Sequence, residues 1–269
     1  MKVSIRTGFD PNDPINPLDG ALKQAKDMGF DGIELCLSPR NRLSIARFGG
    51  PWSSESVTPA MREEFRKSAQ KYGCEIATLS ADWAWTYCEV NPRISQWLGR
   101  GLELLKADIN LAGDLGAKAI LFHVGSSTGT WDEMKAFCSA AGEEGARRGV
   151  KVAYEGSLFP LTGLNGWRGG IATQEDLCRM VDDYSNPFLG VYIHPDYPRR
   201  PEQPHEEVLS VGRRLAGIHS GSINVQVDYQ KYFQAIKDVG YDGYWVFEVG
   251  MDRAASDLGQ FRYLIGRYW

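Results

Sequence analysis

The chain has 269 residues, of which 43% are hydrophobic and 24% are charged, and its formal net charge is −4. That length fits one barrel domain or two smaller domains, and this charge balance provides no basic field for nucleic acid or an anionic membrane. No basic-then-apolar leader precedes the strand-like start at residues 1–5, and no apolar run reaches the length of a membrane span. We therefore expect a soluble, cytoplasmic protein.

The cysteines point to the same compartment. Their number is odd, no two form a CxxC pair, and most lie in or against predicted strands and helices, where buried free thiols are common. The five are Cys36, Cys74, Cys88, Cys138 and Cys178.

After the first predicted strand, one pattern recurs: an amphipathic stretch ends in glycine, and a β-rich run follows almost at once. Glycine just past a helix adopts the left-handed conformation that closes the last turn. Asn186 with Pro187 is expected to end a helix in the same way. The glycines are Gly29, Gly73, Gly116, Gly149 and Gly240, and the β-rich runs after them are residues 32–35, 74–79, 117–124, 150–155 and 241–249.

The stretches between these runs are predicted helices. Thr58 and Pro59 are typical of a helix start, and Thr173 with Asp176 resembles a capping box. One stretch carries an apolar stripe at steps of three and four, formed by Leu98, Leu102, Leu105, Ile109 and Ala112.

The order of elements predicts the fold. A strand followed by a helix, about eight times over, indicates a parallel sheet with crossover helices. No GxGxxG turn follows the first strand, so a closed (β/α)8 barrel fits better than an open doubly wound sheet. We expect a single domain over residues 1–269, with long loops at 49–57 and 157–172 after strands, where a barrel keeps its binding apparatus.

Polar side chains end most of the predicted strands, and in such a barrel they face the active site. Burial of a charged or imidazole group is costly without a partner, and two imidazoles with two carboxylates at one mouth provide four ligands for a divalent cation. The predicted ligands are Glu155, His194, His219 and Glu248. The strand-end residues are Arg6, Glu34, Asp82 with Trp83, His123, Glu155, His194 with Asp196, His219 and Glu248.

Several short segments of the sequence resemble the sugar phosphate isomerase/epimerase superfamily of xylose isomerase-like TIM barrels, and their order and spacing match over the whole chain. They are GFDGIEL (29–35), the strand ending at His123, VKVAYEG (150–156), GIHSGSIN (217–224), residues 227–229 and GYDGYWVFEVG (240–250). The resemblance is to metal-dependent ketose 3-epimerases, which bind one divalent metal through a glutamate, an aspartate, a histidine and a glutamate after the fifth to eighth strands. By this resemblance, the metal ligands of this chain would be Glu155, a residue in the region of His194, His219 and Glu248.

The sixth strand departs from that family pattern. The family has Asp-x-x-His there, whereas this chain has His194-Pro195-Asp196-Tyr197. Strand alternation places His194 at the position of the family's aspartate, so we predict His194 as the ligand and Asp196 as a substrate-contacting group or a group that orients an imidazole.

Some of the other candidate site residues have two interpretations. Arg6 and His123 are predicted to orient substrate hydroxyls, and Glu34 either pairs with Arg6 or contacts substrate. Trp83 and Trp167 either stack on a sugar or anchor loops, whereas Trp52 and Trp85 are interpreted as loop anchors. We interpret His205 as an exposed residue at a helix start.

The expected function is a sugar isomerase or epimerase in which Glu155 and Glu248 remove and return a proton next to a carbonyl, through an enediolate. Mn²⁺ is the expected ion, with Co²⁺, Zn²⁺ or Mg²⁺ as alternatives. A lyase or dehydratase on a keto-sugar or inositol-type substrate remains open, as does a non-catalytic sugar-binding barrel. An apurinic-site endonuclease is disfavoured by the few histidines and the acidity. The expected partner is a small sugar or keto-sugar. Its phosphorylation state stays open, with a non-phosphorylated substrate favoured because no phosphate cradle of clustered glycines and basic residues is visible at the mouth. The loop 157–172 is a predicted lid, and a homo-oligomer is left open.

Overall fold

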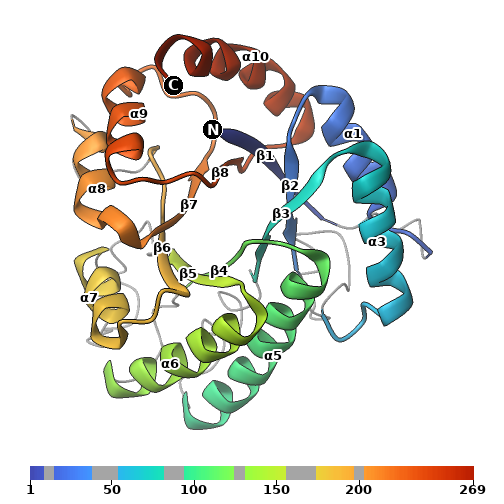
Figure 1. Ribbon diagram of the computed structural model, residues 1–269, viewed down its shortest axis with the longest axis vertical. Helices are drawn as coiled ribbons and strands as arrows, with labels where there is room; N and C mark the ends of the chain where they lie inside the picture. The colour runs from blue at the N-terminus through green and yellow to red at the C-terminus, as the bar shows by residue number, and fades with distance from the viewer. Residues whose placement is uncertain (9–14, 38–53, 82–93, 124–130, 156–173, 197–202) are drawn as a thin grey trace.

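The computed structural model describes residues 1–8, 15–37, 54–81, 94–123, 131–155, 174–196 and 203–269. Within these ranges, eight parallel strands close into a barrel in the order in which they occur along the chain, and helices surround it (Figure 1). The predicted (β/α)8 barrel is confirmed. The strands are β1 (Lys2–Thr7), β2 (Gly32–Cys36), β3 (Glu75–Ser80), β4 (Ala119–His123), β5 (Lys151–Glu155), β6 (Leu189–Ile193), β7 (Leu215–Ser220) and β8 (Tyr244–Phe247).

The helices lie outside the barrel and pack against the outward faces of the strands. In the described part of the chain none of them is long and apolar enough to cross a membrane. They are α1 (Asp19–Met28), α3 (Pro59–Tyr72), α5 (Ile94–Leu115), α6 (Trp131–Arg148), α7 (Gln174–Tyr184), α8 (Pro204–Val211), the short 3-10 helix η1 (Gly212–Arg214), α9 (Tyr229–Asp238) and α10 (Met251–Tyr268).

The predicted helix ends are confirmed at five glycines and wrong at one place. Gly29, Gly73, Gly116, Gly149 and Gly240 all have positive φ. After α7, however, Ser185 takes the left-handed conformation with φ 47°, one residue before Asn186. Asn186 instead accepts a hydrogen bond from the Phe188 amide at 2.9 Å through its side chain, which is the other common use of asparagine in a turn.

The local signals for two helices are also confirmed. Thr58 caps α3 by accepting a hydrogen bond from the Met61 amide at 3.2 Å, with Pro59 as the first helical residue. In α5, Leu105, Ile109 and Ala112 are fully buried in the main core. These caps and stripes fix where each helix lies against its strand.

Each strand separates two environments. Its outward residues join the large core beneath the helices, while inward residues form two small clusters of their own. Because side chains alternate along a strand, every second residue points into the barrel. Along a strand, these inward positions change from polar to apolar and back to polar. On β5, for example, these positions hold Lys151, then Ala153, then Glu155. Polar groups thus gather at both mouths, with apolar layers between them.

Among the described cysteines, Cys36, Cys74 and Cys138 are buried and Cys178 is half-buried, and all four are free thiols. Burial raises the pKa of Cys138 to about 12 and that of Cys74 to about 11. Such thiols stay protonated and unreactive at neutral pH. Cys88 lies outside the described residues.

Candidate functional site

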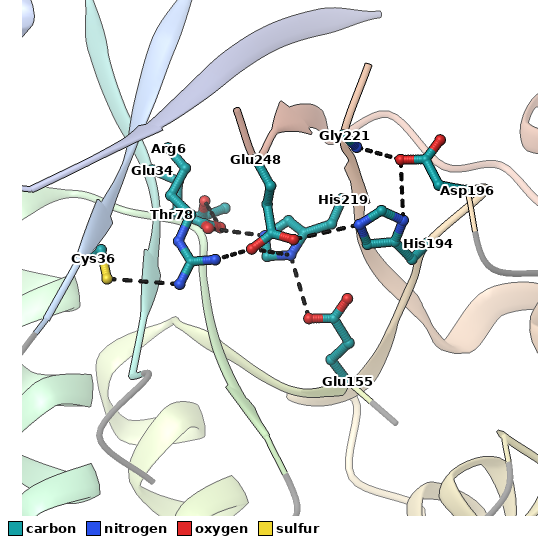
Figure 2. A network of polar contacts seen from close by, with 10 residues as sticks. All are labelled: Arg6, Glu34, Cys36, Thr78, Glu155, His194, Asp196, His219, Gly221 and Glu248. Carbon is teal, nitrogen blue, oxygen red and sulfur yellow. Dashed lines mark hydrogen bonds and ion pairs between the residues drawn. The ribbon is translucent and has the colours of Figure 1, made fainter. Parts of the chain in front are cut away.

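A polar network lies at the C-terminal end of the barrel, where the strands deliver side chains to one place (Figure 2). Its members come from both halves of the sequence: Arg6 of β1, Glu34 of β2, Glu155 of β5 and His219 of β7, with Glu248 directly after β8. Closing the barrel brings β1 next to β8, so residues 242 positions apart become neighbours.

His219 is the centre of this network and is fully buried. Its Nε2 lies 2.8 Å from Oε1 of Glu34. Its Nδ1 faces two further carboxylates, at 3.3 Å from Oε2 of Glu155 and 3.5 Å from Oε1 of Glu248. Because an ionised carboxylate only accepts hydrogen bonds, Nε2 carries a proton and donates it to Glu34.

Glu34 differs from its sequence-based interpretation in two respects. It lies in the middle of β2 rather than at its end, and it is fully buried inside the barrel. Its partners are His219 and Thr78, whose hydroxyl donates to Oε2 at 2.8 Å, whereas Arg6, its neighbour in register across β1 and β2, points its guanidinium at Glu248. Glu34 lies two residues before the end of β2, and this depth accounts for its burial and for its pairing with His219 and Thr78 instead of Arg6.

The buried pair is held in its charged form. Burial alone raises the pKa of Glu34, but the charge and hydrogen bond of His219 outweigh it, so the pKa lies below its ordinary value. Burial lowers the pKa of His219, yet the charges of Glu34 and Glu155 and their hydrogen bonds raise it to about 9. This pKa favours the imidazolium form of His219 at neutral pH.

His194 stands at the edge of the same network, directly after β6, and is buried. Its Nε2 lies 3.4 Å from Oε2 of Glu248, and its Nδ1 lies 3.5 Å from Oδ2 of Asp196. Asp196 is fixed in turn by the Gly221 amide, which donates to the same oxygen (Figure 2). Asp196 thus contacts the outer side of the imidazole whose inner side faces Glu248.

Arg6 contacts both Glu248 and Cys36, a residue that the sequence analysis did not include among the candidate site residues. One guanidinium nitrogen pairs with Glu248, and the other lies 3.7 Å from Sγ of Cys36. Strand alternation contains the missing signal, because Cys36 is two residues after Glu34 and so faces the same interior. Thr78 was missed because it lies deep within β3, where a hydroxyl is usually a packing residue.

Below the network, Tyr192 fills the barrel interior. It is buried, and its ring meets the ring of His219 at 5.0 Å between centroids and 75° between planes. Gly217, opposite it on β7, makes this possible: a Cβ there would lie 2.0 Å from Cζ of Tyr192. A glycine is therefore required for the ring that supports His219 from beneath.

The donor atoms of the four predicted ligands suit a divalent ion in kind, because imidazole nitrogens and carboxylate oxygens both ligate such ions. Donors at about 2.1 Å from a common ion are themselves separated by roughly 3.0–3.4 Å. Three of the six ligand pairs lie near this range, with donor atoms 3.3, 3.4 and 3.5 Å apart. Among the described residues, however, no three His, Cys, Asp or Glu side chains form a group around one centre that could hold a metal ion. Arg6, a cation, contacts Glu248 at this point.

Several predicted site residues lie outside the described part of the chain. These are Asp82, Trp83 and Trp167, the further aromatic residues Trp52, Trp85 and Tyr197, the cap residue Thr173, and the loop 157–172 together with most of the loop 49–57. His123 ends β4, and its backbone is in register with Glu155 of the network. His205 begins α8 as predicted but is half-buried rather than exposed.

The fold recurs in solved structures of low sequence identity. D-allulose 3-epimerase from Methylomonas sp. has a TM-score of 0.70 and 16% identity, over 98% of each chain. D-psicose 3-epimerase from Clostridium cellulolyticum H10 has a TM-score of 0.70 and 13% identity, over 98% of this chain and 99% of that one. 3-Keto-D-glucoside 4-epimerase from E. coli has a TM-score of 0.68 and 16% identity, over 98% of this chain and 100% of that one.

No curated protein sequence matches the chain. Residues 22–263 match the family described as xylose isomerase-like TIM barrel, which covers nearly every strand and helix of the barrel. The chain therefore belongs to the xylose isomerase-like TIM barrel family.

Proposed function

We propose that this protein is a metal-dependent sugar isomerase or epimerase that moves a proton on a carbon next to a carbonyl. The observation that carries the proposal is the approach of two carboxylates, Glu155 from β5 and Glu248 after β8, to the same nitrogen of His219. The fold is shared with proteins named for the epimerisation of sugars, which supports the same reaction class.

The residues that would hold the ion are Glu155, His194, His219 and Glu248. Mixed imidazole and carboxylate donors suit Mn²⁺, Co²⁺ or Zn²⁺ better than Mg²⁺, and we propose Mn²⁺. When bound, such an ion stabilises negative charge on the oxygens of a carbonyl and its neighbouring hydroxyl. The Glu34–His219 contact suits this role, because a metal-binding histidine usually donates its second N–H to a carboxylate that fixes the ring.

The reaction itself requires two groups that exchange a proton with carbon. A carboxylate removes the proton next to the carbonyl, and a second carboxylate returns it on another face or another carbon. We assign these roles to Glu155 and Glu248. Arg6 pairs with Glu248 and so holds that carboxylate in a fixed orientation, and we assign to its guanidinium the orientation of substrate hydroxyls.

A panel of keto-sugars tests the proposal. The purified protein, supplemented with Mn²⁺, is incubated with ketohexoses, ketopentoses and 3-keto-glycosides, and products are separated by chromatography. We expect isomer formation from at least one sugar, abolished by chelation and by Glu155→Gln, and retained in Glu143→Gln, an exposed control on α6. Sugar binding without turnover across the panel would instead indicate a binding protein, and elimination products would indicate a lyase.

A further inference from the structure

The opposite mouth of the barrel contains a cavity of about 660 Å³, within the usual size of a small-molecule site. It lies where the strands begin, so it is separate from the polar network at their ends. The first residues of six strands line it: Lys2 of β1, Glu75 of β3, Ala119 of β4, Lys151 of β5, Leu215 of β7 and Tyr244 of β8.

Small inward residues leave the space for this cavity. Ala119 of β4 and Ala216 of β7 line its wall. Between β5 and β7, Gly190 of β6 continues the same level, where a Cβ would lie 2.5 Å from Cβ of Ala216 and 3.5 Å from Cδ of Lys151. Larger side chains at these positions would fill the mouth, as inward residues do in most barrels.

The lining is positively charged, in contrast to the protein as a whole. Four basic and two acidic side chains line the cavity, a formal excess of two positive charges in a chain of net charge −4. Lys2 is paired with Glu75. The side chains of Lys118, Lys151 and Arg213 form no hydrogen bond or ion pair with any described residue.

Lys151 is the cation set deepest in this group. Its side chain is half-buried, whereas those of Lys118 and Arg213 are exposed at the rim. Burial lowers the pKa of Lys151, although the charge of Asp242 opposes the shift. A cation that is partly desolvated and lacks a paired carboxylate gains more from an incoming anion than a fully hydrated one does.

We propose that this cavity binds a small phosphate-bearing anion, which contacts Lys151 and is enclosed by Lys118 and Arg213. A phosphate monoester carries a charge of about −1.5 to −2 at neutral pH, which matches the excess positive charge of the lining. Tyr241 and Tyr244 also line the cavity and provide apolar area for the organic part of such a ligand. The proposal concerns a second site and does not depend on the function assigned to the first.

One residue joins the two ends of the barrel. Thr78 lines the inner wall of the cavity and donates its hydroxyl proton to Glu34, the partner of His219. A ligand in the cavity therefore lies one side chain away from the hydrogen-bonded pair beneath the proposed catalytic groups.

Calorimetric titration of the purified full chain with inorganic phosphate and with glycerol 2-phosphate tests the proposal. We expect saturable binding of one anion per chain. Lys151→Met, which keeps the aliphatic stem, and Arg213→Gln should each weaken it by about tenfold, the loss typical of one charged hydrogen bond. The exposed Lys118→Gln provides a third variant with little risk to folding.

Two controls locate the bound anion. Lys231→Gln removes a positive charge at the start of α9, outside the cavity, and should leave the affinity within twofold. Arg6→Gln should also leave the anion affinity within twofold, because Arg6 lies in the network at the other mouth. Absence of saturable binding, equal weakening by Lys231→Gln, or loss of binding in Arg6→Gln but not in Lys151→Met would each overturn the proposal.

Discussion

Glu155 and Glu248 differ from glutamine by one heavy atom, so their amide variants test charge and proton exchange while keeping shape. Each variant removes a proton-exchanging group and a metal ligand, and we expect turnover to fall by at least about 100-fold. Melting temperatures should remain close to that of the wild type, measured by calorimetry. Near-normal turnover in either variant would contradict the two-carboxylate mechanism.

His194 and Asp196 have distinct predicted roles, although they contact each other. His194→Ala removes a proposed ligand and should sharply reduce the metal retained after dialysis, measured by mass spectrometry. Asp196→Asn leaves the His194 side chain intact and should spare metal content, while turnover falls because the ring is oriented less firmly. Retention by the alanine variant with loss from the asparagine variant would reverse the two roles.

The pKa of His219 predicts how the stability of the metal-free protein depends on pH. Burial opposes the charged form, but Glu34 and Glu155 raise the pKa to about 9, above the ordinary value near 6.5. The stabilisation is therefore fully present below about pH 6.5 and is lost as the pH rises through 9. We expect the free energy of unfolding, relative to that of His219→Gln, to fall across this range in urea titrations with chelator.

Glu34→Gln provides the matched control for that titration. It removes a neighbouring negative charge while leaving the imidazole, and it should shift the pKa of His219 downward, followed by NMR of the ring proton. An unchanged pKa in this variant, or a difference in unfolding free energy that does not vary with pH, would contradict the assigned ion pair.

At the scale of elements, β6 and β7 depend on a glycine for the packing of the site. Gly217→Ala would bring a Cβ to 2.0 Å from the ring of Tyr192, so the ring must move from beneath His219. Overpacking of this kind typically costs about 1–3 kcal/mol, and we expect a lower melting temperature together with weaker metal binding.

Gly259→Ala is the matched control for this prediction. Gly259 is exposed within α10, where a new Cβ meets nothing within 4 Å. Alanine there should stabilise the helix by about 0.5–1 kcal/mol. If Gly217→Ala melts as the control does, the barrel interior accommodates the methyl group and Tyr192 does not need this glycine.

The sequence predicted the elements well because their signals are local. Helix-closing glycines, the Thr58 cap and the apolar stripe of α5 each act within a few residues. It also predicted which strand-end groups gather, because parallel strands share one polarity. The depth of Glu34, its pairing with His219 and the contact of Arg6 with Glu248 depend on strand register and barrel closure, which no local pattern encodes.

Among the described residues, the two mouths of the barrel in the whole molecule carry side chains of opposite character. Carboxylates and imidazoles converge at the C-terminal mouth, and lysines and an arginine line the N-terminal mouth. The alternation that places Glu155 at one end of β5 places Lys151 at the other, so both sites follow from the same strand geometry. The basic mouth escaped sequence analysis because strand-start lysines are usually solvated surface residues.

The central claim is proton exchange at a carbon next to a carbonyl, and isotope incorporation tests it most directly. The Mn²⁺-loaded protein is incubated in D2O with each sugar of the panel, and the recovered sugars are analysed by mass spectrometry and NMR. We expect one solvent deuterium at a single carbon next to the carbonyl in the converted sugar, and none with Glu155→Gln. Conversion without deuterium, confirmed at early time points, would contradict exchange with a solvent-accessible carboxylate, and deuterium in an unsaturated product would assign a lyase.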